Sequence, residues 1–211
     1  RTDMANKSLQ HSSLTDNIFY RSMLAGNDAY NPEFESDDFL EQVVLSTTAS
    51  SVTFSSLGTY ATAGYKDLQI RMVARSNLSS TYNNDAFITF NSDTAANYSS
   101  HNLYSDGYNV YSGAVATANY IAVKDCVPAA NTPAYGFAPA IVDILDFSNI
   151  YKTTTTRQLS GAQESNNNYD GKIVLGSGLW NNTAAITAIT ITYNNASFVS
   201  GSRFSLYGSL A

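Results

Sequence analysis

The segment of residues 67–76, DLQIRMVARS, alternates between apolar and mostly polar side chains. Leu68, Ile70, Met72 and Ala74 occupy one set of positions, and both arginines occupy the other. Successive side chains of a strand point to opposite faces of a sheet, so this spacing predicts a strand with one apolar face. A helix would need apolar residues three and four apart, and the two arginines break that pattern.

The same alternation returns from residue 39 to the C-terminus and predicts about eleven strands, spaced roughly 8–15 residues apart with polar turns between them. Such spacing favours an all-β fold, a jelly-roll-like antiparallel β-sandwich, over alternating strands and helices. We expect residues 39–48 and 51–56 to form a hairpin and residues 58–64 to form a loop. Residues 140–147 are the most apolar strand and are expected at the centre of a sheet.

Residues 1–38 lack this alternation and predict an irregular N-terminal arm, ahead of a β-sandwich domain of residues 39–211. The arm carries one apolar group: Ile18, Phe19, Met23 and Leu24. A segment with so few apolar side chains cannot build a core of its own. The arm is therefore either a solvated linker or an attachment segment whose apolar group docks on a partner.

Composition narrows the classes of function. Charged residues make up 13% of the chain, and the net charge is −6. Binding to nucleic acid needs clustered Lys and Arg, which are sparse and scattered here, so we expect no nucleic acid partner. We expect no membrane partner either, because the negative charge disfavours an anionic membrane surface and no apolar run approaches the roughly 20 residues of a membrane helix. Cys126 is the single cysteine, so the fold needs no disulfide.

Residues that carry catalysis are few. His101 is expected to be a surface or interstrand histidine, because its sequence neighbours alternate between faces and do not form a triad. Asp143 and Asp146 lie three apart on a strand and face opposite ways, so they cannot act together across a cleft. We expect each to pair with a strand arginine: Arg71, Arg75, Arg157 or Arg203. Pairing of either with a distant acid stays open. No zinc spacing or complete calcium loop occurs, so we expect no metal, no cofactor and no catalytic residue.

Several aromatic residues fall at or near predicted loops: Tyr104, Tyr108, Tyr111, Tyr169 and Trp180. Rings with polar neighbours can stack on sugars, and amphipathic aromatic residues also suit subunit interfaces. Tyrosine is in addition a common strand residue. Three interpretations stay open for this set: a structural role, a subunit interface, or a platform for glycan contact.

Several phrases of the sequence resemble, in the same order, phrases of a known group of proteins. They are VTFSSL, GYKDLQIRMVARS, FITFNSDTAANYSSHNLY, AIVDILDFSN, GLWNNTAAITAITIT and GSRFSLYG, with RSMLAGNDAY upstream. Together they resemble tail-fibre, head-fibre and capsid-decoration modules of tailed-bacteriophage virions, over most of residues 18–210. None of the phrases is a catalytic motif, so no active residue carries over.

The resemblance implies a jelly-roll-like β-sandwich, commonly a homotrimer, on the exterior of a virion. It implies a non-enzymatic structural protein whose partners are a major capsid protein or a fibre or tail protein. The favoured hypothesis is a surface module anchored by its N-terminal arm. One alternative is a receptor-binding tail-fibre module that recognises a host surface glycan. Another is a glycan depolymerase, which the shortage of paired acids disfavours. Capsid and tail positions both stay open.

Overall fold

The computed structural model describes residues 37–79, 83–132, 135–163, 171–193 and 195–210, and these form twelve strands and one short helix. The strands are β1 (Asp38–Val44), β2 (Ser51–Phe54), β3 (Tyr65–Ala74), β4 (Asn83–Phe90), β5 (Tyr98–Ser105), β6 (Val110–Ala118), β7 (Ile121–Pro128), β8 (Ala138–Ile144), β9 (Thr154–Gln163), β10 (Gly171–Trp180), β11 (Ile189–Tyr193) and β12 (Arg203–Leu210). The helix is α2 (Gly58–Thr62). The predicted all-β class is confirmed.

Eight of these strands form a jelly roll. One layer has the order β1-β12-β3-β8, and the other has the order β2-β11-β4-β7. Successive strands alternate between the layers along β1, β2, β3 and β4, and again along β7, β8, β11 and β12. All pairings within the layers are antiparallel. Two four-strand Greek keys packed in this way define a jelly roll, so the predicted jelly-roll-like antiparallel β-sandwich is confirmed.

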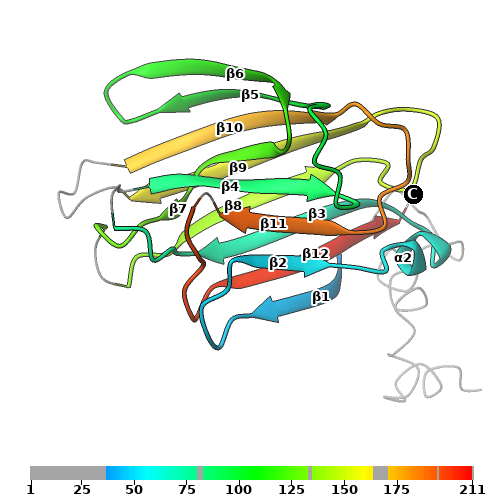
Figure 1. Ribbon diagram of the computed structural model, residues 1–211, viewed down its shortest axis with the longest axis horizontal. Helices are drawn as coiled ribbons and strands as arrows, with labels where there is room; N and C mark the ends of the chain where they lie inside the picture. The colour runs from blue at the N-terminus through cyan, green and yellow to red at the C-terminus, as the bar shows by residue number, and fades with distance from the viewer. Residues whose placement is uncertain (1–36, 80–82, 133–134, 164–170, 194, 211) are drawn as a thin grey trace, which may run out of the picture. The chain divides into compact units, whose positions relative to one another are not determined.

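Four further strands extend the first layer beyond β8, in the order β9-β10-β5-β6. They enter the chain as two pairs, β5 and β6 between β4 and β7, and β9 and β10 between β8 and β11. The result is an eight-stranded sheet with β1 at one edge and β6 at the other (Figure 1). We call β9, β10, β5 and β6 the wing.

The apolar positions of β3 point between the two layers, as the alternation of residues 67–76 predicts. Leu68, Ile70, Met72 and Ala74 are buried in the core, while Arg71 lies on the outer face. Large aromatic side chains fill the same space: Phe54, Phe90, Phe147, Phe198, Phe204, Tyr98 and Trp180. Burial of such surface stabilises the sandwich by about 25 cal/mol per Å² of apolar area.

Three expectations for local structure have different outcomes. The hairpin predicted for residues 39–48 and 51–56 is wrong, because β1 pairs with β12 in one layer while β2 pairs with β11 in the other. The short link between β1 and β2 crosses the sandwich instead of turning back within a sheet. Residues 58–64, expected to be a loop, contain α2. The central place predicted for residues 140–147 is confirmed, because β8 has β3 and β9 as neighbours.

The N-terminal arm predicted for residues 1–38 falls outside the described residues except for its last two positions. Its apolar group, Ile18, Phe19, Met23 and Leu24, is not described, and the role of that group stays a prediction. Tyr169 also lies outside the described ranges. Among the residues that are described, no helix has the length and apolar character needed to cross a membrane.

Candidate functional site

The outer face of β8 and of the adjoining wing carries a continuous row of aliphatic side chains. Ile141 of β8 lies opposite Leu159 of β9, Leu159 opposite Leu175 of β10, and Leu175 opposite Leu103 of β5. Directly opposed residues of antiparallel strands share a face and lie about 4.5–5.5 Å apart at Cβ. We call these four residues the outer row. Their exposed fractions lie between 38% and 55%, so the row faces solvent rather than the core.

Few charges interrupt this surface. Among the outward positions of the four wing strands, Arg157 is the only formally charged side chain. Its Nε atom pairs with Oδ2 of Asp143 at 2.6 Å. Beside the outer row, an apolar depression of about 330 Å³ lies at Gly161, lined by Pro139, Leu159 and Ile173 among others. The outer face of β8 and the wing therefore combines aliphatic side chains with Ser, Thr and His residues, and its charges are those of the Arg157–Asp143 pair.

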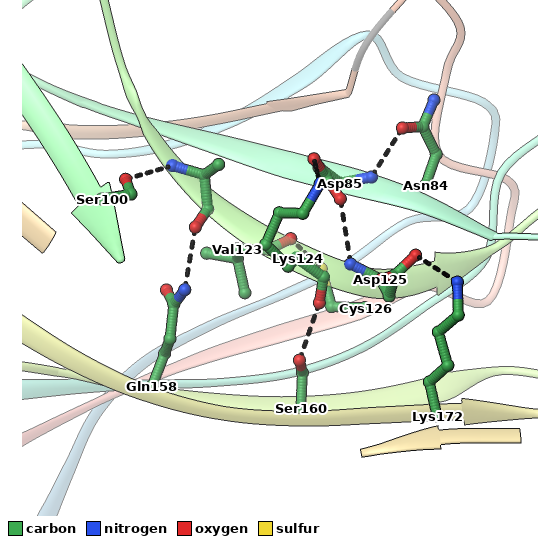
Figure 2. A network of polar contacts seen from close by, with 11 residues as sticks. Asn84, Asp85, Ser100, Val123, Lys124, Asp125, Cys126, Gln158, Ser160 and Lys172 are labelled. Atoms are coloured by element: carbon green, nitrogen blue, oxygen red, sulfur yellow. Dashed lines mark hydrogen bonds and ion pairs between the residues drawn. The ribbon is translucent and has the colours of Figure 1, made fainter. Parts of the chain in front are cut away.

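The inner face of β9 has the opposite character. Its buried residues are mainly polar: Thr154, Thr156, Gln158 and Ser160. Gln158 donates from Nε2 to the carbonyl of Ala122 at 2.8 Å, and Ser160 donates from Oγ to the carbonyl of Lys124 at 2.8 Å. Both carbonyls belong to β7, so side chains of the wing hold the main chain of the opposite layer (Figure 2). β9 thus turns polar groups inward, while Leu159 of the outer row faces solvent.

Charged residues complete this contact at one side of β7. Lys124 pairs with Asp85 of β4 at 2.8 Å, and Lys172 of β10 pairs with Asp125 at 3.4 Å (Figure 2). Oδ1 of Asp85 also accepts a hydrogen bond from the backbone N–H of Asp125 at 3.0 Å. Asp125 has a φ of +46°, next to the register shift between β4 and β7. This left-handed residue turns the chain so that Lys124 and Asp125 reach different partners.

The electrostatics of the group keep Lys124 charged. Burial by itself lowers the pKa of Lys124, but the hydrogen bond to Asp85 and the attraction of Asp85 and Asp125 together outweigh it, so the pKa is raised. Lys172 also lies over the ring of Tyr104, with Nζ 5.8 Å from the ring centroid. These contacts join β4, β7, β10 and β5. They hold the two layers together and have no catalytic arrangement.

Two glycines of β10 allow the layers to approach. A Cβ atom at Gly178 would lie 2.6 Å from both Ile121 Cγ2 and Thr156 Oγ1, closer than real Cβ contacts. A Cβ atom at Gly176 would collide with the side-chain amide of Gln158. Gly176 and Gly178 are therefore required by the close approach of β10 to Gln158, Thr156 and Ile121.

The tyrosines singled out from the sequence gather at the tip of the β5–β6 hairpin. The rings of Tyr104 and Tyr111 stack with their centroids 4.9 Å apart. The hydroxyl of Tyr111 donates to Oδ2 of Asp106 at 3.1 Å, and Tyr108 is 73% exposed. We call Tyr104, Tyr108 and Tyr111 the tyrosine cluster.

Trp180 does not belong to this cluster, and its prediction as a glycan contact is wrong. The side chain is 1% exposed and packs between Phe90 and Tyr98 in the core. Its indole Nε1 donates to Asp93 Oδ2 at 2.8 Å. A ring buried in this way cannot stack on a sugar.

The remaining candidates of the sequence have mixed outcomes. Asp143 pairs with Arg157 as predicted, whereas Asp146 pairs with Lys152 and not with an arginine. His101 is exposed on the outer face of β5, in the register row of Arg157 and Ser177. Cys126 is buried, and burial raises the pKa of its thiol. Within the described ranges, no three His, Cys, Asp or Glu side chains gather as metal ligands.

Comparisons with known proteins add little to this geometry. No protein family matches the chain, and no curated protein matches it. Among solved structures, an exo-inulinase from Aspergillus awamori is similar over 85% of this chain and 30% of its own, with a TM-score of 0.41 and 10% identity. A structure titled for the cell entry of botulinum neurotoxin type C through two ganglioside molecules is similar over 83% of this chain and 42% of its own, with a TM-score of 0.26 and 9% identity.

The outer row is not evident from the sequence. The alternation of β9 identifies two faces, Thr154-Thr156-Gln158-Ser160 and Thr155-Arg157-Leu159, and neither is distinctly apolar. One signal was present: the two glycines of β10 mark a place where another part of the chain comes close.

Proposed function

We propose that this protein is a non-enzymatic structural subunit of a tailed-bacteriophage virion. It is displayed on the particle exterior as a capsid-decoration or fibre module and fastened by its N-terminal arm. The observation that carries the proposal is the outer row, which presents Ile141, Leu159, Leu175 and Leu103 in one register across four strands. The resemblance of the sequence phrases to virion modules supports the same conclusion.

The exposed aliphatic side chains of the outer row indicate that the protein is a subunit of an assembly. An antiparallel sheet with one solvated face carries polar residues on that face, and soluble monomers rarely expose a broad apolar patch. Here the outer row places an exposed aliphatic side chain on each of four adjacent strands, while the inward positions of β9 are mainly polar. Covering the outer row against another subunit would remove apolar surface from water, at about 25 cal/mol per Å². We assign the row to contacts within the particle, in a homotrimer or with a capsid or fibre protein.

Immuno-electron microscopy tests the location. Antibody raised against the purified chain should label the outside of intact particles of the phage whose genome encodes it. Label confined to cell debris, with clean particles, would reject the proposal. A chain that lacks residues 1–30 should fold and yet fail to enter particles, and normal entry would overturn the role of the arm.

The outer row has its own test. Leu175→Ser and Leu103→Ser change exposed positions, so each should alter the free energy of unfolding by less than about 0.5 kcal/mol. Incorporation into particles should fall strongly for the double variant. Thr53→Ser, an exposed change on β2, serves as the matched control and should be incorporated normally. Normal incorporation of the double variant would assign the row no role in assembly.

One observation favours a second function, recognition of a host surface glycan. The tyrosine cluster places three rings at one hairpin tip, with Lys172 and Asp106 beside them as polar groups. Rings with polar neighbours of this kind stack on sugars. A glycan array probed with the wild-type chain and with Tyr108→Ala tests this function. Binding that the substitution abolishes would establish receptor recognition, and absence of binding would leave the structural role alone.

A further inference from the structure

We infer that β6 is a pairing edge, which a second copy of this chain occupies with its own β6. The two strands would run antiparallel about a two-fold axis and join two eight-stranded sheets into one. The inference stands on the edges of the sheets and does not rest on the proposed function.

The other sheet edges are protected against such pairing. At the opposite end of the same sheet, β1 carries Asp38 and Glu41 and has a register shift at residues 39–41. In the four-stranded layer, β2 has only four residues. The last edge, β7, carries Lys124 and Asp125, has a register shift with β4 and ends at Pro128. Charges, short length, bulges and proline are the usual means by which edge strands avoid association.

The edge strand β6 is long and uncharged, and its register with β5 is regular from Val110 to Val115. Its register shift lies near the C-terminal end, between the pairs Ser100–Val115 and Tyr98–Ala118. Its nine residues, VYSGAVATA, contain no charge and no proline, and the first eight are exposed. Within the described part of the chain it pairs with β5 alone, so its outer side is open. Val110, Tyr111 and Val115 expose 71%, 39% and 43% of their surfaces. A long, uncharged and apolar edge of this kind is an association site.

The hydrogen-bonding groups of β6 point the right way for pairing. At the hairpin tip the N–H of Asp106 donates to the carbonyl of Asn109 at 3.4 Å. Bonded and non-bonded pairs alternate along antiparallel strands, so the backbone groups of Val110, Ser112 and Ala114 point away from β5. Each of these three alternate residues therefore presents both a donor and an acceptor to a strand at the open side.

A second copy fits this edge better than a strand of opposite charge. The chain has a net charge of −6, so two copies repel one another unless they meet where neither is charged, and β6 is such a place. A two-fold axis at Ala114 sets that residue opposite its own copy and sets Gly113 opposite Val115. The bulkier side chain then lies across from the smallest one. The same pairing brings the two outer faces into one continuous surface.

Disulfide trapping in the full chain tests the pairing. Cys126 is buried, so a cysteine introduced by Ala114→Cys is the reactive one. Pairing about Ala114 brings the two Cα atoms to about 5.5 Å, which is within disulfide range. Mild oxidation should convert the Ala114→Cys chain to a covalent dimer. Thr53→Cys, on the exposed edge strand β2, is the matched control and should stay monomeric.

A second variant separates pairing from folding. The N–H of Ser112 points outward, so Ser112→Pro removes a donor to the partner without breaking the bond pattern with β5. Light scattering should show a wild-type mass above the monomer that Ser112→Pro lowers, with the thermal unfolding curve retained. The inference would be overturned by a monomeric wild type, by equal cross-linking of both cysteine variants, or by an unchanged mass in Ser112→Pro. Capture of a strand from another protein by a monomeric chain would overturn it too.

Discussion

The indole of Trp180 donates a hydrogen bond from Nε1 to Oδ2 of Asp93 at 2.8 Å, and this bond joins β10 to the loop after β4. Asp93 also accepts from the side chain of Asn97 and from the N–H of Ala95, both at 2.9 Å. Tyr98 stacks on Trp180 and donates to the carbonyl of Asp93 at 3.0 Å. A single aspartate therefore satisfies the buried indole and closes the turn into β5.

Replacing Asp93 with alanine should destabilise the fold. The change leaves the indole N–H of Trp180 buried without its acceptor, and loss of hydrogen bonds to a charged group costs about 1.5–3 kcal/mol. Urea unfolding followed by the fluorescence of Trp180, the single tryptophan, measures the effect. Thr94→Ala, one residue away and exposed, is the control and should change the free energy of unfolding by less than about 0.5 kcal/mol. Equal stability of the two variants would contradict this account.

The same contacts predict a pH dependence. The hydrogen bond from Asn97 lowers the pKa of Asp93 most, followed by those from Ala95 and Trp180. A carboxyl with a lowered pKa in the folded chain stabilises it above the unfolded pKa of about 3.9, and that stabilisation is lost as the pH falls through the folded value. The stability gap between wild type and Asp93→Asn should be constant near neutral pH and shrink below about pH 4. A gap that widens on acidification would refute it.

Substituting alanine for Gly178 should destabilise the contact between the layers. The added Cβ would lie 2.6 Å from Ile121 and from Thr156, and overpacking of this kind costs about 1–3 kcal/mol. The Tm from calorimetry reports the change. Gly58→Ala is the matched control, because nothing lies within 4 Å of its added Cβ. A Gly178→Ala chain as stable as Gly58→Ala would mean that the layers move apart without cost.

The pair formed by Lys124 and Asp85 should contribute most below alkaline pH. Lys124→Met leaves Asp85 without its 2.8 Å cation, and we expect a loss of about 1–3 kcal/mol. Because the pKa of Lys124 is raised in the folded chain, this stabilisation is fully present at neutral pH. It should decline as the pH rises through that pKa, above about 10. Denaturant titrations at neutral and alkaline pH measure both effects, and a pH-independent loss would contradict the assignment to charge.

The thiol of Cys126 should react only when the chain unfolds. The side chain is fully buried between the layers, and its raised pKa keeps it protonated at neutral pH. Labelling with a thiol reagent should therefore be slow in buffer and accelerate in urea with the same midpoint as Trp180 fluorescence. Rapid labelling of the folded chain would show that β7 opens locally.

The alternation of residues 67–76 was sufficient to predict β3, because an amphipathic strand is a local property. The hairpin expected between residues 39–48 and 51–56 failed for a non-local reason. A link of a few residues can form either a turn within one sheet or a crossing between two layers. The crossing forms here because β1 pairs with β12 and β2 pairs with β11, and both partners lie more than 100 residues away along the chain.

The burial of Trp180 and the exposure of Leu159 could not be predicted from the sequence, because both depend on contacts with distant parts of the chain. Trp180 ends a strand beside a predicted loop, and only its register with Tyr98 and its contact with Asp93 place it inside. In β9, the face that carries Gln158 and Ser160 turns inward because the carbonyls of β7 accept their hydrogen bonds. Hydrophobicity alone would have assigned Leu159 to the core.

The wing leaves the eight jelly-roll strands complete, since every pairing within β1-β12-β3-β8 and β2-β11-β4-β7 exists without it. Both strand pairs are additions to loops of that framework. Mutations that alter the outward chemistry of the wing therefore do not disturb the framework beneath. The chemistry that the wing presents to solvent can therefore vary without the loss of any strand pairing of the jelly roll.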